Sequence, residues 1–337
     1  MNKKNLIGIA GLAVLGGFLW FKSQTVINPS WEQPAMSSSA HITLSGSFKA
    51  NRLKMLRRQI DTALEDSKRT VNIWDESTEI SRFNRFNSTE PFPVSPELAR
   101  IIQYTLDFSK QTGGAFDPTV KPLVDHWGFG PKADAESLED IMQRIGWQKV
   151  RLENGALVKT NPRLQLDLAA IADGYGADCV AEVIRRSGCT RFMVEVGGEL
   201  VAEGTNRSGN PWRIGIESPI PGKAPGEEFQ RMVKISGKAL ATSGDYRNFQ
   251  IRADGTRYSH IIDPHTGKPA ASDVASVTVI AKRCIDADAL ATALSVMGSE
   301  KGLRWLEAHP EFQAFFILHH ADGSFISKAT PEFPKAD

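Results

Sequence analysis

The sequence predicts an α+β fold in which mixed sheets pack with helices in one continuous region, residues 36–330. Strand and helix candidates alternate without the regular βαβ order of a doubly wound sheet. No low-complexity break or internal repeat divides this region, and its chain has ordinary globular composition, with 41% apolar and 23% charged residues. We therefore expect one folded region, either undivided or in two lobes, although 337 residues would also allow two domains.

The helices are predicted by apolar residues at three- and four-residue spacing and by signals at their ends. The first helix is expected over residues 52–71. The second is expected over residues 95–112, where Ser95 is followed by proline and Gly113 ends the pattern. The remaining helices are expected over residues 135–145, with Ser137 as a cap, and over residues 168–187, 288–296 and 300–309, with Gly298 between the last two.

The strands are predicted by short apolar runs between turn residues. The clearest hairpin signal is Asn154-Gly155 within residues 151–166. Other strands are expected over residues 41–44, 192–196, 212–217, 232–235, 239–242, 248–251 and 274–281, with a closing pair over 312–319 and 324–327.

Residues 1–22 are predicted to be a signal anchor or signal peptide. Two lysines precede a stretch of sixteen uncharged residues, Leu6 to Phe21, and Lys22 ends it. No small-residue cleavage site and no lipoprotein cysteine follow closely, which favours an anchor that stays attached. The positive-inside rule then places the bulk of the chain outside the cytoplasm. Residues 23–35 are polar and read as a linker, and residues 331–337 as a tail.

The overall charge gives no reason to expect a nucleic-acid partner. Forty Lys and Arg residues are balanced by 39 Asp and Glu residues, which leaves a net charge of +1. The three cysteines have no metal-finger or CxxC spacing, so a zinc ribbon and a disulfide framework are not expected. The motifs GxSxG, HExxH and GxxxxGK[ST] are also missing from the sequence.

Asp288 and Thr292 are the first candidate site. Residues four apart share one face of a helix, so this carboxylate and hydroxyl point the same way. Hard oxygen atoms of this kind suit Mg²⁺. The alternative is structural, with Asp288 capping the helix and Thr292 bonding back to it.

Asp167 stands where a strand turns into a helix, so it can cap that helix or bind a ligand. Gly174 and Gly176 follow within the helix, where each costs about 1 kcal/mol relative to alanine. Such a cost indicates a close approach by backbone, side chain or ligand.

His260 ends an extended run just before the turn sequence Asp263–Gly267. An imidazole in this place can serve as a general base near neutral pH, or it can be structural. Glycines and aromatic residues between Gly114 and Gly130 can form the wall of a planar-ligand pocket or a packed loop. Gly197-Gly198 lacks the GxGxxG spacing of a nucleotide-binding loop and reads as a tight turn.

Seven ordered blocks together resemble the bacterial FAD:protein FMN transferase family, also called the ApbE family. The resemblance spans roughly residues 36–330. The blocks are TEISRFN from Thr78, GAFDPTVKPLVDHWGFG from Gly114, LDLAAIADGYGAD from Leu166, VEVGGEL from Val194, ALATSGDYRNF from Ala239, YSHIIDPHTGKP from Tyr258 and ADALATALSVMG from Ala287.

The resemblance implies a Mg²⁺-dependent transfer of FMN from FAD onto a threonine or serine hydroxyl of a target protein, with release of AMP. In this family pattern, Asp288 and Thr292 supply side-chain ligands to Mg²⁺, and the backbone carbonyl of Ala170 adds another. His260 matches the histidine that deprotonates the acceptor hydroxyl, so His260 and Asp288 are the expected catalytic residues.

The resemblance also implies a set of residues that contact FAD: Met36, Trp74, Ala115, Phe116, Asp117, Asp167, Asp173 and Ile262. Trp74 takes the place of a tyrosine that stacks on the flavin, and a tryptophan can still stack. Met36 is followed by Ser37 where the family has glycine. Asp173 replaces a lysine; because an acid repels a diphosphate in the absence of a metal, Asp173 either helps to hold a metal or points away.

The implied partners are FAD and an acceptor flavoprotein subunit of a membrane redox complex. With the N-terminal helix in the bacterial inner membrane, the transferase domain is expected on the periplasmic side. Two alternatives stay open, of which the first differs from the transferase only in using water as the acceptor and the second would not need Asp288, Thr292 and His260 together. One is a FAD pyrophosphatase that gives FMN and AMP, and the other is an exported flavin-binding protein without enzymatic activity.

Overall fold

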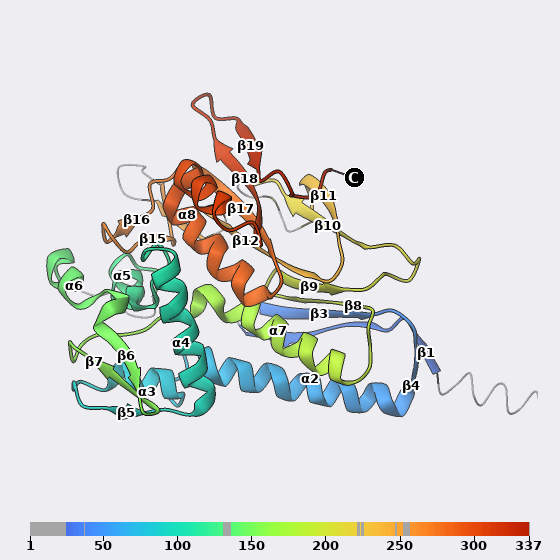
Figure 1. Cartoon of the computed structure of the whole chain (residues 1–337), viewed down its shortest axis with the longest axis horizontal. Coiled ribbons are helices and arrows are strands. Elements are labelled where there is room, and N and C mark those ends of the chain that lie inside the picture. The colour runs from blue at the N-terminus through green and yellow to red at the C-terminus, as the bar shows by residue number, and fades with distance from the viewer. Residues whose placement is uncertain are drawn as a thin grey trace, which may run out of the picture.

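An eight-stranded antiparallel sheet forms the centre of the molecule, as Figure 1 shows for the computed structural model. The structure describes residues 25–36, 38–130, 136–220, 223, 226–246, 248–251 and 257–336. The strand order is β19-β18-β17-β12-β9-β8-β3-β2. The bounds are β2 Ser30–Ala35, β3 Ser38–Leu44, β8 Phe192–Val196, β9 Glu199–Glu203, β12 Lys238–Gly244, β17 Val274–Ala281, β18 Gln313–His319 and β19 Phe325–Ala329.

Three long helices cover one face of this sheet: α2 (Ala50–Val71), α7 (Ala169–Arg186) and α8 (Cys284–Glu307). The hairpin of β10 (Trp212–Glu217) and β11 (Phe229–Ile235) covers part of the other face. Every residue of β17 is buried, because alternate side chains enter the two layers. Val277 and Val279 pack in the core under α8, whereas Ile280 packs against the hairpin.

The second lobe contains the shorter elements and lies beside one end of the main sheet (Figure 1). Its helices are α3 (Glu79–Arg85), α4 (Pro96–Gln111), α5 (Lys121–His126) and α6 (Leu138–Arg144), with short 3₁₀ turns at Pro118–Val120 and Trp147–Lys149. Its three-stranded sheet has the order β5-β7-β6, with bounds β5 Phe92–Pro93, β6 Val150–Glu153 and β7 Ala156–Lys159. The mixed α+β fold agrees with the sequence prediction.

Three two-stranded pairs complete the fold. β1 (Thr25–Ile27) pairs with β4 (Ser47–Lys49), β13 (Phe249–Ile251) with β14 (Arg257–Ser259), and β15 (Ile262–Asp263) with β16 (Lys268–Pro269).

Local signals placed most elements well. Ser95 caps α4 by accepting the amide of Leu98, and Ser137 caps α6 by accepting the amide of Asp140. Asn154-Gly155 forms the β6–β7 turn, with positive φ at both residues. The strands predicted over residues 212–217 and 274–281 have the observed bounds.

Two predictions differ from the observed elements. Residues 30–35, expected in a linker, form β2, which pairs with β3 along its whole length. The last helix starts at Cys284 rather than Asp288, because the carboxylate of Asp178 accepts the amides of Cys284 at 2.9 Å and Ile285 at 3.0 Å. Gly298, with φ 77° and ψ 168°, is not helical and divides α8 into two helical parts, as the sequence predicted for this position.

The two ends of the chain were expected to lie outside the catalytic region. The predicted anchor, residues 1–22, lies outside the described residues. None of the helices in the described part of the chain has the length and apolar character needed to cross a bilayer. Phe333 of the predicted tail is buried, stacked on Phe315 with ring centroids 5.5 Å apart.

Candidate active site

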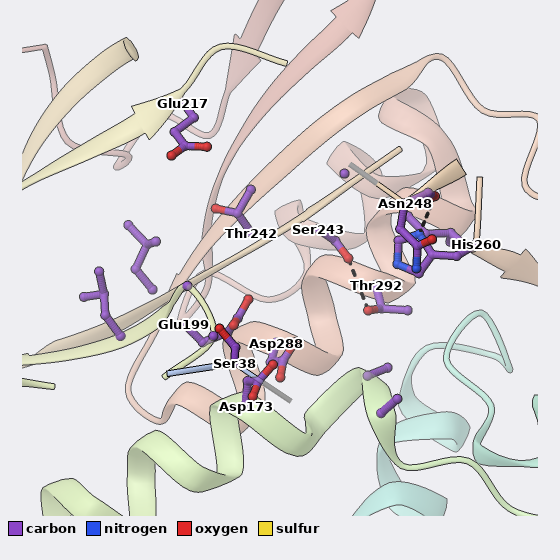
Figure 2. Close-up of a pocket in the computed structure, with 18 of the residues that line it drawn as sticks. Ser38, Asp173, Glu199, Glu217, Thr242, Ser243, Asn248, His260, Asp288 and Thr292 are labelled. Carbon is purple, nitrogen blue, oxygen red and sulfur yellow. Dashed lines mark hydrogen bonds between the residues drawn. The ribbon is translucent and has the colours of Figure 1, made fainter. Parts of the chain in front are cut away.

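A cleft of about 1000 Å³ lies between the two lobes and the β10–β11 hairpin. This volume is at the upper end of the range for small-molecule sites. All of the residues predicted for the site line this cleft, with the exception of Met36. They come from five separate segments of the chain, and the fold alone brings them together. Figure 2 shows the part of the cleft around Asp288 and His260.

Met36 lies beside the cleft and not in its lining. Its side chain packs in the core between α2 and α7, where a Cβ on Gly176 would come within 2.6 Å of the Met36 Cε atom. The backbone of Met36 has a φ of 49°, and Ser38, two residues on, is in the lining. The Met36 side chain therefore packs with the helix layer, and a contact between Met36 and FAD stays a prediction.

The close approach predicted from Gly174 is the contact between α7 and α8. A Cβ on Gly174 would lie 2.7 Å from the carbonyl oxygen of Cys284 and 2.8 Å from Cβ of Asp288. Only glycine lets the two helix backbones meet at this distance. The close approach brings the amide of Gly174 to Oδ2 of Asp288, to which it donates at 3.0 Å.

Asp288 and Thr292 lie one turn apart on α8, in the cleft lining (Figure 2). Asp288 lies in the second turn of α8, so it does not cap the helix, and the alternative of a structural cap is wrong. The Thr292 hydroxyl lies 3.3 Å from the Ser243 hydroxyl. In a regular helix the amide of Gly174 would donate to the carbonyl oxygen of Ala170. Here this amide donates to Oδ2 of Asp288, so the Ala170 carbonyl can accept another partner.

The environment of Asp288 suits a cation. Burial raises the pKa of Asp288 well above its ordinary value, and the charge of Asp173 raises it further. Burial likewise raises the pKa of Glu199 well above its ordinary value, with added repulsion from Asp288 and Asp173. A divalent cation would offset this repulsion and keep the carboxylates ionised.

Asp173 points into this same group of acids (Figure 2). Its Oδ1 atom is buried and has no hydrogen-bond partner among the described residues, and burial raises the pKa of Asp173 to about 6. Gly197, at the turn between β8 and β9, has a φ of 64°, and a Cβ there would overlap the Asp173 carboxylate. Asp173 therefore points toward Asp288 and Glu199 rather than away from them, and a part in holding a metal stays a prediction.

Within the described ranges, no group of three or more His, Cys, Asp or Glu side chains has the arrangement of a metal site. A cation beside Asp288 would therefore need other oxygen donors. The Thr292 hydroxyl and the Ala170 carbonyl are donors of the kind that Mg²⁺ prefers, and both lie in the lining. The residues present thus fit Mg²⁺.

His260 has the tautomer that a general base needs. Its Nδ1 atom lies 3.1 Å from the carbonyl oxygen of Asn248. A carbonyl oxygen can only accept, so Nδ1 carries the proton and Nε2 keeps its lone pair. Burial lowers the pKa of His260, which keeps the imidazole neutral at pH 7.

The hairpin that carries His260 is fixed against the loop after α5. Gln250 of β13 donates through Nε2 to the carbonyl oxygen of Gly128 at 2.7 Å and accepts the Tyr258 hydroxyl at 2.9 Å. Phe129 contacts the rings of Tyr258 and His260 edge to face, at centroid distances of 5.7 and 6.2 Å. The His260 ring is therefore held by the carbonyl oxygen of Asn248 and by the ring of Phe129.

The predicted FAD-contacting residues in the second lobe form another wall of the cleft. Ala115 and Phe116 belong to the buried core, and Trp74 stands at the rim with 58% of its surface exposed. Asp117 holds the loop itself, because its carboxylate accepts the amides of Thr119 at 2.8 Å and Trp147 at 2.9 Å. An exposed indole beside this ordered loop can stack on a planar ligand.

Asp167 and Ile262 complete this part of the lining. Asp167 is buried and accepts the amide of Ala169 at 2.8 Å, so the capping role expected for it is present together with a place in the cleft. Burial raises the pKa of Asp167, and the charge of Lys121 opposes that rise. Ile262 packs against α5 and α6 and joins the cleft wall to the second lobe.

Several lining residues were missed by the sequence reasoning. Glu199, Ser243 and Asn248 lie inside the motif blocks that carried the resemblance. Those blocks indicated a functional region, but they did not single out these three side chains. Glu217 and Phe229 come from the β10–β11 hairpin, which has no motif. Only the folding of that hairpin over the sheet reveals their position.

The chain is similar to proteins that are named for flavin transfer. The model of the ApbE family matches residues 36–316. The FAD:protein FMN transferase of Vibrio cholerae serotype O1 is 41% identical over 276 residues, which are 80% of this chain and 81% of the relative. The protein of the same name from Escherichia coli K12 is 34% identical over 324 residues, which are 89% of this chain and 91% of the relative.

Two solved structures have the same fold. The flavin transferase ApbE from Vibrio cholerae has a TM-score of 0.80 at 37% identity, over 92% of this chain and 98% of that one. The apo form of the flavinyl transferase ApbE from Pseudomonas stutzeri has a TM-score of 0.80 at 33% identity, over 91% of this chain and 95% of that one. Both lobes, and therefore the cleft between them, fall within this likeness.

Proposed function

The chain belongs to the ApbE family, and from that premise we propose that it is an FAD:protein FMN transferase. It moves the FMN part of FAD onto a threonine or serine hydroxyl of a target flavoprotein and releases AMP. The acceptor oxygen forms a new bond to the FMN phosphorus, and the bond between that phosphorus and the oxygen bridging to AMP breaks. The acceptor is left with a phosphoester-linked flavin.

The observation that carries the proposal is that one cleft contains both a neutral histidine and a buried carboxylate–hydroxyl pair. The free Nε2 atom of His260 can take the proton of the acceptor hydroxyl. Asp288, Thr292 and the carbonyl of Ala170 are the donors that would hold Mg²⁺. When bound, Mg²⁺ would neutralise negative charge on the diphosphate of FAD.

The remaining lining residues would hold the rest of FAD. Trp74 offers a face for stacking, while Ala115 and Phe116 form a closed apolar wall. The carboxylate of Asp167 can accept a hydrogen bond from a donor on the ligand. Because Ala115 and Phe116 are buried, this wall can orient FAD and exclude water from the diphosphate.

We place this reaction on the periplasmic side of the bacterial inner membrane. The support is the apolar stretch of Leu6 to Phe21, which would anchor the chain and leave residues 36–330 outside the cytoplasm. The acceptor would then be a flavoprotein subunit of a membrane redox complex with its flavin domain on the same side.

The proposal is tested by incubating the protein with FAD, MgCl₂ and an acceptor protein that exposes a threonine. We expect equal amounts of AMP, measured by chromatography, and of flavin fluorescence on the acceptor in a denaturing gel. AMP without protein-bound flavin would instead identify a FAD pyrophosphatase. Bound FAD with no AMP under any condition would identify a flavin-binding protein that is not an enzyme.

Asp288→Asn and Asp286→Asn form a matched pair for the metal site. Both residues lie in the first turns of α8, but Asp286 pairs with Arg283 at 2.5 Å and does not line the cleft. We expect Asp288→Asn to lose Mg²⁺-dependent turnover by more than about a hundredfold while the fold is kept, since a charged ligand is removed. Asp286→Asn should keep that turnover within a fewfold. Full Mg²⁺-dependent activity of Asp288→Asn would contradict the assignment of this carboxylate to the metal.

A further inference from the structure

The start of α2 presents an exposed basic surface, which we call the basic end. It consists of Lys49, Arg52, Lys54, Arg57 and Arg58, all of which are exposed. Between residues 45 and 60 the sequence contains these five basic residues and no acidic residue. Among the described residues, none of the five forms an ion pair with an acid, and Arg57 lies over the ring of Trp31 at 4.4 Å. The chain as a whole is nearly neutral, so this concentration of charge is local.

This charge is unfavourable for the helix that carries it. The first turn of α2 contains no acidic residue, and Lys49 at its N-cap makes no capping side-chain bond. Positive side chains at the N-terminus of a helix oppose the helix dipole, which favours anions there. The basic side chains lower the stability of α2 and make no ion pair within the described part of the chain in return. Their presence therefore points to a negatively charged surface that meets the basic end.

Exposed apolar side chains accompany the basic end. Val26 and Ile27 in β1 are 36% and 67% exposed, and Met55 in α2 is 62% exposed. β1 pairs with β4, so Thr25 lies opposite Lys49 and Val26 opposite Phe48. Met55 stands between Lys54 and Arg58 on the outward side of α2. Apolar and basic side chains mixed on one surface are typical of contact with the interface of a lipid bilayer.

The position of the basic end in the chain indicates the same partner. β1 begins at Thr25, three residues after Lys22, where the predicted anchor ends. Three residues span at most about 10 Å, so an anchor in the bilayer holds β1 and the basic end close to the head groups. This step depends on the predicted anchor and not on the transferase reaction.

We propose that the basic end binds the head groups of anionic phospholipids. The lysine and arginine side chains would pair with lipid phosphates, while Val26, Ile27 and Met55 would enter the interface. α2 leads away from this contact for 22 residues, about 33 Å (Figure 1). Trp74, which lines the cleft, follows three residues after the end of α2. The contact would therefore set the height and direction of the cleft above the membrane.

The test uses the full-length protein with vesicles of phosphatidylcholine, alone or with 30% phosphatidylglycerol. An environment-sensitive fluorophore is attached through Met55→Cys, or through Ser327→Cys in β19 as the control position away from the basic end (Figure 1). Native thiols interfere little, since Cys189 and Cys284 are buried and burial raises the pKa of Cys179 to about 11. Binding is read by vesicle flotation, by the shift of probe emission and by quenching from spin-labelled lipid.

We expect quenching of the probe at residue 55 to be at least threefold stronger with phosphatidylglycerol than without it, and to fall in 0.5 M NaCl because salt screens the contact. The pair Lys54→Gln and Arg58→Gln should remove most of this difference. The matched pair Lys301→Gln and Lys328→Gln, which lies outside the basic end, should not change it. FAD turnover in detergent should be equal in both pairs and in the parent protein.

The proposal would be overturned by equal quenching at residue 55 in both vesicle types or by quenching at residue 327 as strong as that at residue 55. It would also be overturned if neutralising Lys54 and Arg58 left the quenching at residue 55 unchanged. Failure of the protein to float with anionic vesicles would also overturn it. Absence of FAD turnover in the parent protein in detergent would contradict the proposed function instead, so the two failures are distinguishable.

Discussion

Replacing Gly174 with alanine tests how tightly the helix contact controls the site. The added Cβ would lie 2.7 Å from the carbonyl oxygen of Cys284, whereas ordinary van der Waals contact begins near 3.4 Å. Because the opposing atoms are backbone, α7 and α8 must separate by about 0.7 Å, and this separation moves Asp288 away from the amide of Gly174.

The expected change in stability is small because two effects oppose each other. Overpacking costs about 1–3 kcal/mol, while alanine is about 1 kcal/mol better than glycine inside a helix. Gly174→Ala should therefore lower the free energy of unfolding by about 0–2 kcal/mol. Activity should suffer more, since a displacement approaching 1 Å at a catalytic group costs up to about a hundredfold. We expect a ten- to hundredfold loss of turnover, roughly, with an increased requirement for Mg²⁺.

Gly176→Ala is the matched control on the same helix. Its Cβ would come within 2.6 Å of the Met36 Cε atom, which is the end of a flexible side chain and can rotate away. We expect unchanged turnover and a stability equal to the parent or about 1 kcal/mol higher. Thermal unfolding and FAD turnover against Mg²⁺ concentration measure both variants. If the two variants behave alike in turnover, the backbone contact does not control the position of Asp288.

Two further predictions concern titrating groups in the cleft. Burial lowers the pKa of His260 below 6.5, so the rate of transfer should be constant from pH 7 to 8 and decline at acidic pH as the imidazole takes up a proton. His260→Ala should lose most of the activity and the acidic decline in rate, with FAD affinity unchanged. An acidic decline that persists in the variant would indicate another base. Burial raises the pKa of Asp173 from 3.8 to about 6, so the ionised carboxyl destabilises the metal-free fold as pH rises from about 4 to about 6. Asp173→Asn should therefore be more stable than the parent at pH 7.5, by at most about 3 kcal/mol, and equally stable near pH 4. Chemical denaturation without Mg²⁺ measures this difference in the free energy of unfolding. A difference that does not vary with pH would contradict the burial argument.

The sequence contained most of the chemistry of the candidate site, because the reactive residues sit in short local patterns. Asp288 and Thr292 share a helix face because they are four residues apart. His260 precedes a turn that is specified by the turn residues Asp263–Gly267 themselves. Gly174 signalled a close approach, since glycine inside a helix is costly, but the sequence could not say that the neighbour is the backbone of α8.

Features that depend on residues far apart in the sequence were not predictable. α8 begins at Cys284 because its cap is Asp178, which lies 106 residues earlier in the chain. β2 is a polar edge strand with little apolar periodicity, and backbone pairing with β3 holds it in place. Its own sequence therefore did not predict a strand.

The sequence by itself determined which side chains could react, most of the helices and strands, and the family to which the chain belongs, because motifs and periodicities are local. The tertiary structure alone decided that Met36 packs away from the cleft, that Asp173 and Glu199 crowd around Asp288, and that His260 has a free Nε2 atom. Each of these depends on a contact between distant segments, and burial of the charged groups makes the contact matter: removing water strengthens the repulsion among the acids and keeps the histidine neutral.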